Sequence, residues 1–400
     1  MVYHSWLDKS TNNDLYSPLE DLMPGRERER KTSTAARVLR SIWKHPKSSR
    51  IAIAERLGLD KSTITNQVNA LIDLGVIEEI EEGESSARGG RKPISLDIRK
   101  SFGRILGIEI QSRAWRAVEL DLAGNILSER RGSAEVSPDN FADLAAEISA
   151  ESAAATGDVV ELDNRLGPLL GVGIGTGGLI DQKHSRIRYS VPLDIYEPVE
   201  LGPAFASRIP FPCFIENDAN CCAWGELAFD RENEARNFLF ALVEYRRDQD
   251  ALREYGGIGV GFGIVLGGKV FPGSHGNAGE FRSAFCDGPG EVQFAIDKER
   301  LALLSKDQSA LEQVSDELAR NMALLVNTMD FERVYIGGDI EDLGVNFPSI
   351  LHRRLEDNWM YPFPKDISIR YSSMGGRAVA YGAAGLILDK LVSESLLPGI

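Results

Sequence analysis

The stretch Arg104–Leu122 reads RILGIEIQSRAWRAVELDL and places a short polar segment between two largely apolar runs. Such runs are typical of buried strands, and the polar break between them predicts a turn. A comparable pair of strands is expected near residues 238–271, where a run rich in Leu, Val and Phe precedes one rich in glycine. Two strand pairs at comparable places in two halves indicate an α/β body built from two lobes of related topology.

The segment before this body differs from it in charge. The 400 residues carry a net charge of −15, yet residues 25–72 contain 11 Lys and Arg against 4 Asp and Glu. The acidity therefore belongs to the rest of the chain. A basic head on an acidic body is typical of a DNA-binding protein, although a basic segment can also be only a solvated surface.

Residues 34–100 are predicted to form a winged helix-turn-helix domain, which follows a flexible tail over residues 1–33. Apolar residues recur at helical spacing in three short segments, and an alternating stretch broken by Gly and Ser then predicts a β-hairpin. Asp60 is suited to cap the third helix, and Gly75 lies just past its end. The helices are expected from residue 35 onward, over residues 51–59 and over residues 60–75, and the hairpin over residues 76–98.

The third helix has two faces of different character. Apolar residues, Ile64 and Val68 among them, share one face, and short hydrogen-bonding side chains lie on the other near the helix N-terminus. Recognition helices present such groups to base edges and phosphates in the major groove, whereas the alternative is a solvated polar face. The basic flank and the glycine-rich wing favour DNA binding. The candidate DNA-binding residues are Lys61, Ser62, Thr63, Asn66 and Asn69 in the helix and Arg88, Arg91 and Lys92 in the wing.

The wing and the body both resemble the ROK family, which contains sugar kinases and sugar-responsive repressors. Gly90-Arg91-Lys92-Pro93 is similar to the element that ends the wing of the family's repressors. Four stretches of the body resemble the family in the same order. They are FIENDANCCAWGE (214–226), GIGVGFGIVLGGKVFPGSHGNAGEF (257–281), VYIGGDI (334–340) and AYGAAGLI (380–387).

The resemblance covers roughly residues 35–390 and implies an actin-like (ribonuclease H-like) two-lobed fold of the kind used by ATPases and sugar kinases. On this basis we expect the first lobe over residues 101–217 plus about 376–400, and the second lobe over residues 218–375.

The resemblance also implies a ligand-binding site. Asn217 and Asp218 match the family's sugar-contacting pair, and Glu280 matches its sugar-binding glutamate. In the kinases this aspartate accepts a proton from the attacked hydroxyl, which is the work of a general base. The alternative for Asp218, placed just before a predicted helix, is a structural hydrogen bond such as a helix cap.

Three departures from the family's pattern concern ATP. The turn after the first strand has Gln111, Ser112 and Arg113 in place of two glycines and a threonine, and their Cβ atoms restrict the backbone conformations that glycine permits. Ile258 stands where the kinases have threonine, and Asp339 replaces a glycine near the expected adenosine site. A lone Arg113 cannot replace the converging amides of a phosphate loop. We therefore expect no catalytic residue and no cofactor.

The family's zinc element is also missing. Ser283 stands at the position of its histidine, and only Cys286 lies downstream. One thiol cannot complete a tetrahedral site, so we expect no metal. Pro192 lies near a position where the family often has a sugar-contacting asparagine. The four cysteines show no C-x-x-C spacing, which indicates a reducing cytoplasm, and no apolar run is long enough to enter a membrane.

The sequence therefore predicts a DNA-binding transcriptional regulator that represses genes of sugar uptake or catabolism. Its partners would be operator DNA and a sugar or sugar-phosphate effector, and it would act as a homodimer or a dimer of dimers. Two alternatives remain open. One is an active ATP-dependent sugar kinase with an appended head, and the other is a regulator whose body is a dimerisation scaffold without a ligand.

Overall fold

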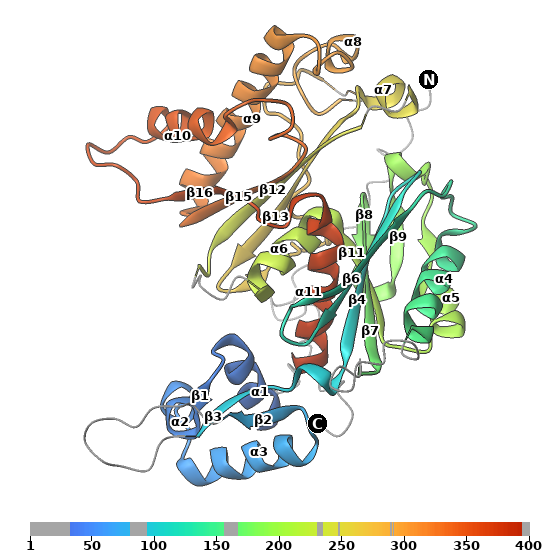
Figure 1. Ribbon diagram of the computed structural model, residues 1–400. Helices are drawn as coiled ribbons and strands as arrows, with labels where there is room; N and C mark the ends of the chain where they lie inside the picture. The colour runs from blue at the N-terminus through green and yellow to red at the C-terminus, as the bar shows by residue number, and fades with distance from the viewer. Residues whose placement is uncertain are drawn as a thin grey trace, which may run out of the picture.

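The computed structural model shows a small head attached to a larger body that contains two five-stranded sheets (Figure 1). The expected tail, apart from Ser33, and the wing residues Arg88, Arg91 and Lys92 lie outside the described part of the chain, so the predictions for them stay predictions. The structure describes residues 33–80, 94–155, 167–229, 235–246, 249–288, 290 and 292–393.

The head is a winged helix-turn-helix domain, as predicted. Its elements are α1 (Thr34–Lys44), β1 (Ser48–Ser49), α2 (Arg50–Leu57), α3 (Lys61–Asp73), β2 (Ile77–Ile80) and β3 (Ser95–Ile98). Gly58 ends α2 with a φ of 63°, a left-handed conformation that glycine adopts without strain. Asp60 then caps α3 by accepting a hydrogen bond of 2.8 Å from the Thr63 N–H. These two residues fix the turn between the helices, and β2 and β3 pair as the expected antiparallel hairpin.

The two large sheets share one topology. The first has the order β11-β7-β4-β5-β6 and the second the order β14-β13-β12-β15-β16. In the first sheet, β4, β5 and β6 are antiparallel neighbours, and β7 and then β11 are added in parallel on the other side of β4. In the second sheet, β12, β13 and β14 are antiparallel neighbours, and β15 and then β16 are added in parallel on the other side of β12. The predicted two lobes of related topology are confirmed.

The strands of the first sheet are β4 (Arg104–Ile110), β5 (Trp115–Asp121), β6 (Ile126–Gly132), β7 (Leu169–Thr176) and β11 (Cys213–Asn217). Those of the second are β12 (Phe238–Tyr245), β13 (Ile258–Leu266), β14 (Lys269–Val270), β15 (Arg333–Gly338) and β16 (Ser368–Tyr371). A small third sheet consists of β8 (Leu179–Asp181), β9 (Arg186–Tyr189) and β10 (Val199–Glu200). The helices of the body are α4 (Phe141–Ala154), α5 (Gly202–Arg208), α6 (Asp218–Phe229), α7 (Gln249–Tyr255), α8 (Lys298–Leu301), α9 (Gln308–Met329), α10 (Phe347–Asp357) and α11 (Ala378–Ser393).

Two helices, α6 and α11, lie between the sheets (Figure 1). α11 packs on the first sheet and α6 on the second, and they pack closely against each other. A Cβ atom built on Gly382 of α11 would lie 1.7 Å from the Cys221 carbonyl oxygen of α6. A Cβ atom on Gly107 of β4 would lie 1.8 Å from the Ala380 carbonyl oxygen. Glycine therefore permits backbone-to-backbone approach on both sides of α11.

The head is held against the body by α1, which packs on the C-terminal half of α11. Arg40 of α1 forms an ion pair of 2.9 Å with Asp389 of α11. Trp43 meets Phe229, the last residue of α6, edge to face with ring centroids 6.2 Å apart. Buried residues of the head and of the first sheet belong to one continuous hydrophobic cluster, so the two parts share a core.

Candidate functional site

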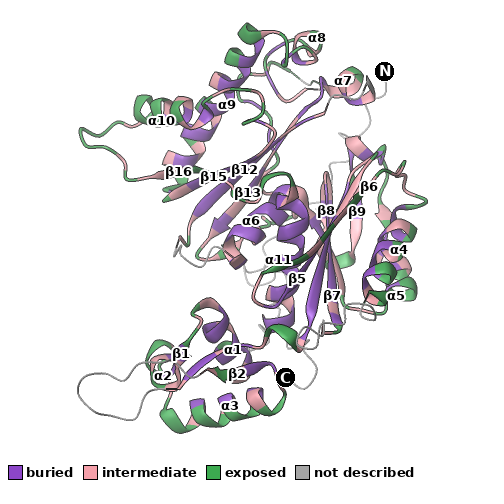
Figure 2. Ribbon diagram, in the orientation of Figure 1, coloured by how far each residue is buried: buried purple, intermediate pink, exposed green. Residues whose placement is uncertain are grey.

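The outer face of α3 carries the candidate DNA-binding residues of the head. Lys61, Ser62, Asn66 and Asn69 are exposed, Thr63 is half-buried, and the apolar side of the helix is buried (Figure 2). The sequence reasoning missed one exposed member of this stripe. It is Thr65, which the spacing of four residues from both Lys61 and Asn69 could have indicated.

Some of these side chains already have partners within the head. The Ser62 and Thr63 hydroxyls donate hydrogen bonds of 2.6 and 2.7 Å to the Asp60 carboxylate. Asn69 accepts a bond of 3.3 Å from Arg50 of α2, which also pairs with Glu79 of β2 at 2.7 Å. Lys61 and Asn66 have no hydrogen bond or ion pair from their side chains to other described residues. Asn66 is thus the amide on this face that is free to meet a base edge.

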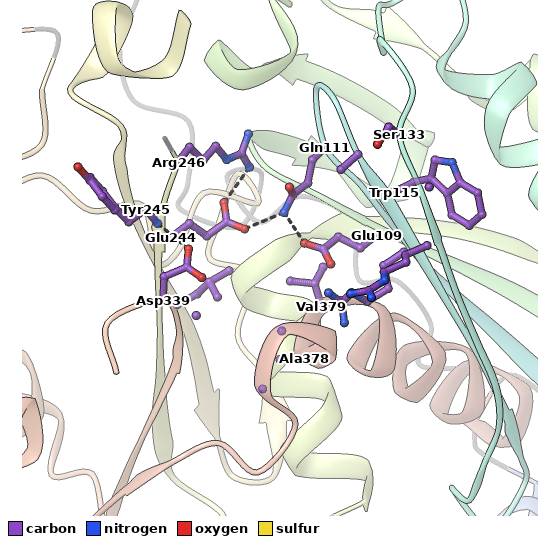
Figure 3. A pocket seen from close by; sticks show the side chains of 18 residues that line it. Glu109, Gln111, Trp115, Ser133, Glu244, Tyr245, Arg246, Asp339, Ala378 and Val379 are labelled. Carbon is purple, nitrogen blue, oxygen red and sulfur yellow. Dashed lines mark hydrogen bonds and ion pairs between the residues drawn. The ribbon is translucent and has the colours of Figure 1, made fainter. Parts of the chain in front are cut away.

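The Gln111 side chain extends from the polar turn between β4 and β5 toward Glu109 and Glu244 (Figure 3). The turn closes with a bond of 2.9 Å from the Gln111 N–H to the Ala114 carbonyl. The Gln111 amide donates to Glu109 at 2.6 Å and to Glu244, at the end of β12, at 3.2 Å. Gln111 therefore links the first sheet to the second through its side-chain amide.

Two carboxylates meet at this link. Burial, reinforced by the nearby charge of Glu244, raises the pKa of Glu109 to about 8. Glu244 itself pairs with Arg246 at 2.8 Å. Arg113 forms an ion pair with Asp250 of α7, so the one cation of the turn is already engaged.

A cavity of about 570 Å³ lies beside this link. Asp339 lies on its wall, and its carboxylate accepts a hydrogen bond of 2.7 Å from the Tyr245 N–H (Figure 3). The carboxyl groups of Glu109, Glu244 and Asp339 border the space, and so do the guanidinium groups of Arg116, Arg131 and Arg246. The cavity also meets the N-terminal end of α11 at Ala378 and Val379.

A second cavity, of about 330 Å³, shares Leu242, Glu244 and Arg246 with the first. It contains the predicted ligand-binding residues. The structure brings together Asn217, Asp218 and Glu280, which come from β11, from α6 and from the segment after β14. Apolar side chains form much of the rest of its wall. They are Leu179, Val191, Pro192, Tyr255, Ile258 and Val260.

Asn217 and Asp218 differ in whether their side chains serve a structural role in the protein. Asn217 accepts a hydrogen bond of 3.2 Å from the Asn220 N–H and donates one of 3.1 Å to the Gly178 carbonyl. Asn217 is therefore the cap of α6. Asp218 was expected just before a helix, but the helix begins at Asp218 itself.

The Asp218 carboxylate is poorly solvated. Burial, followed by the neighbouring charge of Glu244, raises the pKa of Asp218 to about 7. Its Oδ1 accepts a bond of 2.7 Å from the Ala219 N–H, and a hypothetical Cβ on Gly177 would lie 3.1 Å from Oδ2. Within the described ranges, no side chain donates a hydrogen bond to Asp218 or to Glu280. These two carboxylates are the acceptors that a ligand could use.

The region compared with the family's zinc element is filled by hydrogen bonds. Asn321 of α9 donates a bond of 3.1 Å to the buried Ser283 hydroxyl, and the Cys286 thiol lies 3.7 Å from the Gln293 carbonyl. No group of three His, Cys, Asp or Glu side chains suited to a metal is found among the residues that the structure describes.

Sequence reasoning missed Glu244 and Arg246, which form the partition between the two cavities. Both follow the apolar run of β12 in the segment Glu244-Tyr245-Arg246-Arg247. The abrupt change from an apolar strand to charged residues at a strand end was the available signal, because ligand sites often lie at such ends.

Comparisons with known proteins agree with this division into a head and a body. The winged helix-turn-helix DNA-binding family matches residues 33–78, and the ROK family matches residues 106–282. The xylose repressor of Caldicellulosiruptor bescii is 23% identical over 89% of this chain and 95% of the repressor. The xylose repressor of Bacillus spizizenii is 28% identical, over 61% of this chain and 58% of the repressor.

Among solved structures, a ROK family transcriptional regulator described as a homologue of the Escherichia coli MLC protein has the same fold. It superposes with a TM-score of 0.70 at 20% identity, over 91% of this chain and 97% of that chain. In the described ranges, every helix is too short or too polar to cross a membrane.

Proposed function

We propose that this chain, which carries a winged helix-turn-helix DNA-binding domain followed by a ROK family domain, is a transcriptional repressor whose body binds a small carbohydrate effector. The observation that carries this proposal is the exposed polar face of α3 on a head that shares its core with α11. A head packed in this way can present α3 to a major groove, and its contact with α11 joins it to the part of the body that contains the cavities.

The body is proposed to bind its effector without transferring phosphate. Gln111 occupies the turn that would have to hold phosphate, and Arg113 is engaged by Asp250. The adjoining cavity is lined by Arg116, Arg131 and Arg246 as well as by carboxyl groups, so the proposal depends on the turn itself, where the Gln111 side chain bridges the lobes. These contacts support the proposal that the body has no kinase activity, because the Gln111 side chain fills the turn and bonds to both lobes.

The second cavity is the proposed effector site. Asp218 and Glu280 can each accept hydrogen bonds from hydroxyl groups, and the apolar wall can pack on the C–H face of a sugar ring. Two relatives of this chain are named xylose repressors, which makes a pentose the first effector to test.

A route from this cavity to the head follows from the packing of the helices. Asp218 is the first residue of α6, α6 packs against α11 at Gly382, and Asp389 of α11 pairs with Arg40 of the head. An effector that changes the approach of the two lobes would therefore shift the position of the head. It can move the equilibrium off DNA only by its difference in affinity for the two arrangements.

A symmetric operator requires two heads, so we propose that the repressor acts as a homodimer on operator DNA. Genome-wide mapping of the DNA that the protein binds tests the repressor proposal and identifies the operator. Binding near genes of sugar transport or catabolism is expected. Uniform, sequence-independent binding, or measurable turnover of ATP with a panel of hexoses and pentoses, would contradict it.

Replacing Asn66 with alanine is expected to weaken operator binding about tenfold or more, since a bidentate contact from asparagine to adenine contributes about 1–3 kcal/mol of discrimination. Fluorescence anisotropy with the mapped operator measures this. Gln67→Ala is the matched control, because Gln67 is the next residue on α3 but is half-buried and lies off the exposed stripe. Equal affinities for the wild type and Asn66→Ala would show that this face does not read DNA.

Replacing Asp218 with asparagine is expected to abolish most of the thermal stabilisation that the effector provides. A ligand at 100 times its Kd stabilises a protein by about 2.7 kcal/mol, which a thermal-shift screen of sugars and sugar phosphates detects. Asp143→Asn, on the exposed side of α4, is the control for a lost carboxylate.

One observation favours the alternative in which the body is only a dimerisation scaffold. The Asn217 amide, one of the predicted ligand contacts, already serves as the cap of α6. A screen in which no sugar shifts the wild type would support a body that only dimerises. A shift that survives in Asp218→Asn would instead place the effector elsewhere.

A further inference from the structure

The helix α7 is an addition to the second lobe. The two sheets share one topology, and in the first sheet β4 is joined to β5 by the turn 111–114, which contains no helix. The corresponding strands of the second sheet, β12 and β13, are joined by residues 246–257, which include α7. Figure 1 shows α7 at the end of the β12–β13 pair, and the ion pair between Arg113 and Asp250 joins it to the turn of the first lobe. α7 is thus placed where the two lobes meet.

Tyr255, the last residue of α7, is held in place by the chain that follows it. Gly256 and Gly257 both have a φ of 77°, in the left-handed region. The Gly257 N–H donates a hydrogen bond of 3.0 Å to the Ala251 carbonyl, and its carbonyl accepts one of 2.7 Å from the Arg246 N–H. A Cβ atom on Gly257 would lie 2.4 Å from the Arg246 carbonyl oxygen. The backbone after α7 therefore closes onto the end of β12 and fixes the position from which the Tyr255 side chain extends.

A third cavity, of about 370 Å³, lies between α7 and the first lobe and adjoins the second cavity, the proposed effector cavity. The two cavities share Pro192 of the first lobe and Tyr255 of the second. Their other walls differ, because charged side chains from both lobes line the third cavity. They are Arg113, Glu135, Asp194, Asp250, Arg253 and Glu254. Most of these side chains are exposed, so the third cavity has the character of an entrance that is open to solvent.

We propose that Tyr255 sets the size of the effector, so that the effector cavity admits one sugar ring and excludes a second ring linked to it. This inference rests on the proposed function, because it concerns the carbohydrate that the same cavity would bind. Pro192 and Tyr255 reach the junction of the two cavities from opposite lobes. A disaccharide with one ring in the effector cavity would have to place its glycosidic bond where these side chains stand, and a clash of this kind is a direct source of specificity.

The proposal implies that removal of the Tyr255 ring joins the two cavities. A second sugar ring could then occupy the third cavity, where carboxylate and guanidinium groups are available for hydrogen bonds to its hydroxyl groups. Tyr255→Ala is therefore expected to gain a ligand rather than only to lose one, which a general weakening of the fold would not produce.

The first test compares a monosaccharide with a disaccharide on the full-length protein by isothermal titration calorimetry. The wild type is expected to bind D-xylose at least tenfold more tightly than β-1,4-linked xylobiose. Tyr255→Ala is expected to bind xylobiose at least tenfold more tightly than the wild type does. Tyr255→Phe keeps the ring and should keep the preference for D-xylose. Tyr189→Ala is the matched control, because Tyr189 lines the effector cavity but not the third cavity, and it should gain no affinity for xylobiose.

A wild type that binds the two sugars equally, or a Tyr255→Ala variant that binds xylobiose no better than Tyr189→Ala does, overturns the proposal. Thermal unfolding identifies a variant that has lost its fold. Tyr255→Val, which keeps an apolar side chain but removes the ring, takes the place of Tyr255→Ala in that case.

A second test does not depend on the identity of the sugar. Ile258 lines the effector cavity but not the third cavity, so a cysteine introduced by Ile258→Cys reports access to the effector cavity. In a Cys286→Ser background, Tyr255→Ala is expected to speed its labelling by a bulky methanethiosulfonate at least tenfold and to change the rate for methyl methanethiosulfonate much less. Equal rates for the bulky reagent with and without the Tyr255 ring would overturn the size limit. A selective gain in rate in a protein that binds no sugar would sustain the size limit and contradict the carbohydrate effector instead.

Discussion

Replacing Gly382 with alanine is expected to destabilise the body by roughly 2–3 kcal/mol, because the added methyl group overpacks a tightly filled contact. It would lie 1.7 Å from the Cys221 carbonyl oxygen, which is backbone and cannot rotate away. Alanine favours a helix over glycine by about 1 kcal/mol, so the loss from overpacking must exceed that gain. Urea unfolding, followed by circular dichroism, measures the net change.

Two other glycines of the same contact provide a graded control. A Cβ on Gly385 would lie 3.0 Å from the Trp224 carbonyl oxygen, and one on Gly225 would lie 3.2 Å from the Gly382 Cα. Alanine at either position is expected to destabilise less than alanine at Gly382. Equal stability of Gly382→Ala and the wild type would contradict the close approach of α6 to α11.

The same contact matters for regulation. α6 begins at Asp218 in the effector cavity, and α11 carries Asp389 at the head. Gly382→Ala should therefore reduce the change in operator affinity that the effector causes. The operator affinity without effector should fall less, when both are measured well below the unfolding temperature.

Local signals predicted the head well. Asp60 and Gly58 act through their own neighbours in the chain, a cap bond to Thr63 and a left-handed turn, so their roles can be inferred from sequence alone. The two sheets were also predictable, because each begins with a pair of long apolar strands, although the sequence did not indicate that α7 lies between β12 and β13.

The candidate site depended on pairs that no local pattern reveals. Gln111 meets Glu244, which is 133 residues away, and Arg113 meets Asp250. The family resemblance implied a departure from a glycine-rich phosphate loop at this turn, but only the fold shows that the lobes are joined there by hydrogen bonds. In the same way, the role of Asn217 as a helix cap required the true start of α6, which small residues at 219–223 left ambiguous.

Replacing Glu109 with glutamine is expected to stabilise the protein at pH 8 and to change little at pH 5. The pKa of Glu109 is raised from 4.5 to about 8 in the folded protein, so between these values the folded state holds a proton that the unfolded state releases. The free energy of unfolding therefore falls as pH rises through this window, and glutamine removes that loss. A pKa shift of one unit corresponds to about 1.4 kcal/mol, and after allowance for relaxation of the site we expect a gain of roughly 1–3 kcal/mol at pH 8.

The measurement is the urea midpoint of the wild type and of Glu109→Gln at several pH values from 5 to 8. The amide oxygen introduced by this substitution can still accept the hydrogen bond from Gln111, so the bridge between the lobes is kept and only the ionisable group is lost. Glu147→Gln, on the exposed side of α4, is the matched control and should leave the pH dependence unchanged. Parallel curves for the wild type and Glu109→Gln would mean that Glu109 is already ionised at neutral pH. Glu109 would then add its negative charge to the wall of the adjoining cavity at neutral pH.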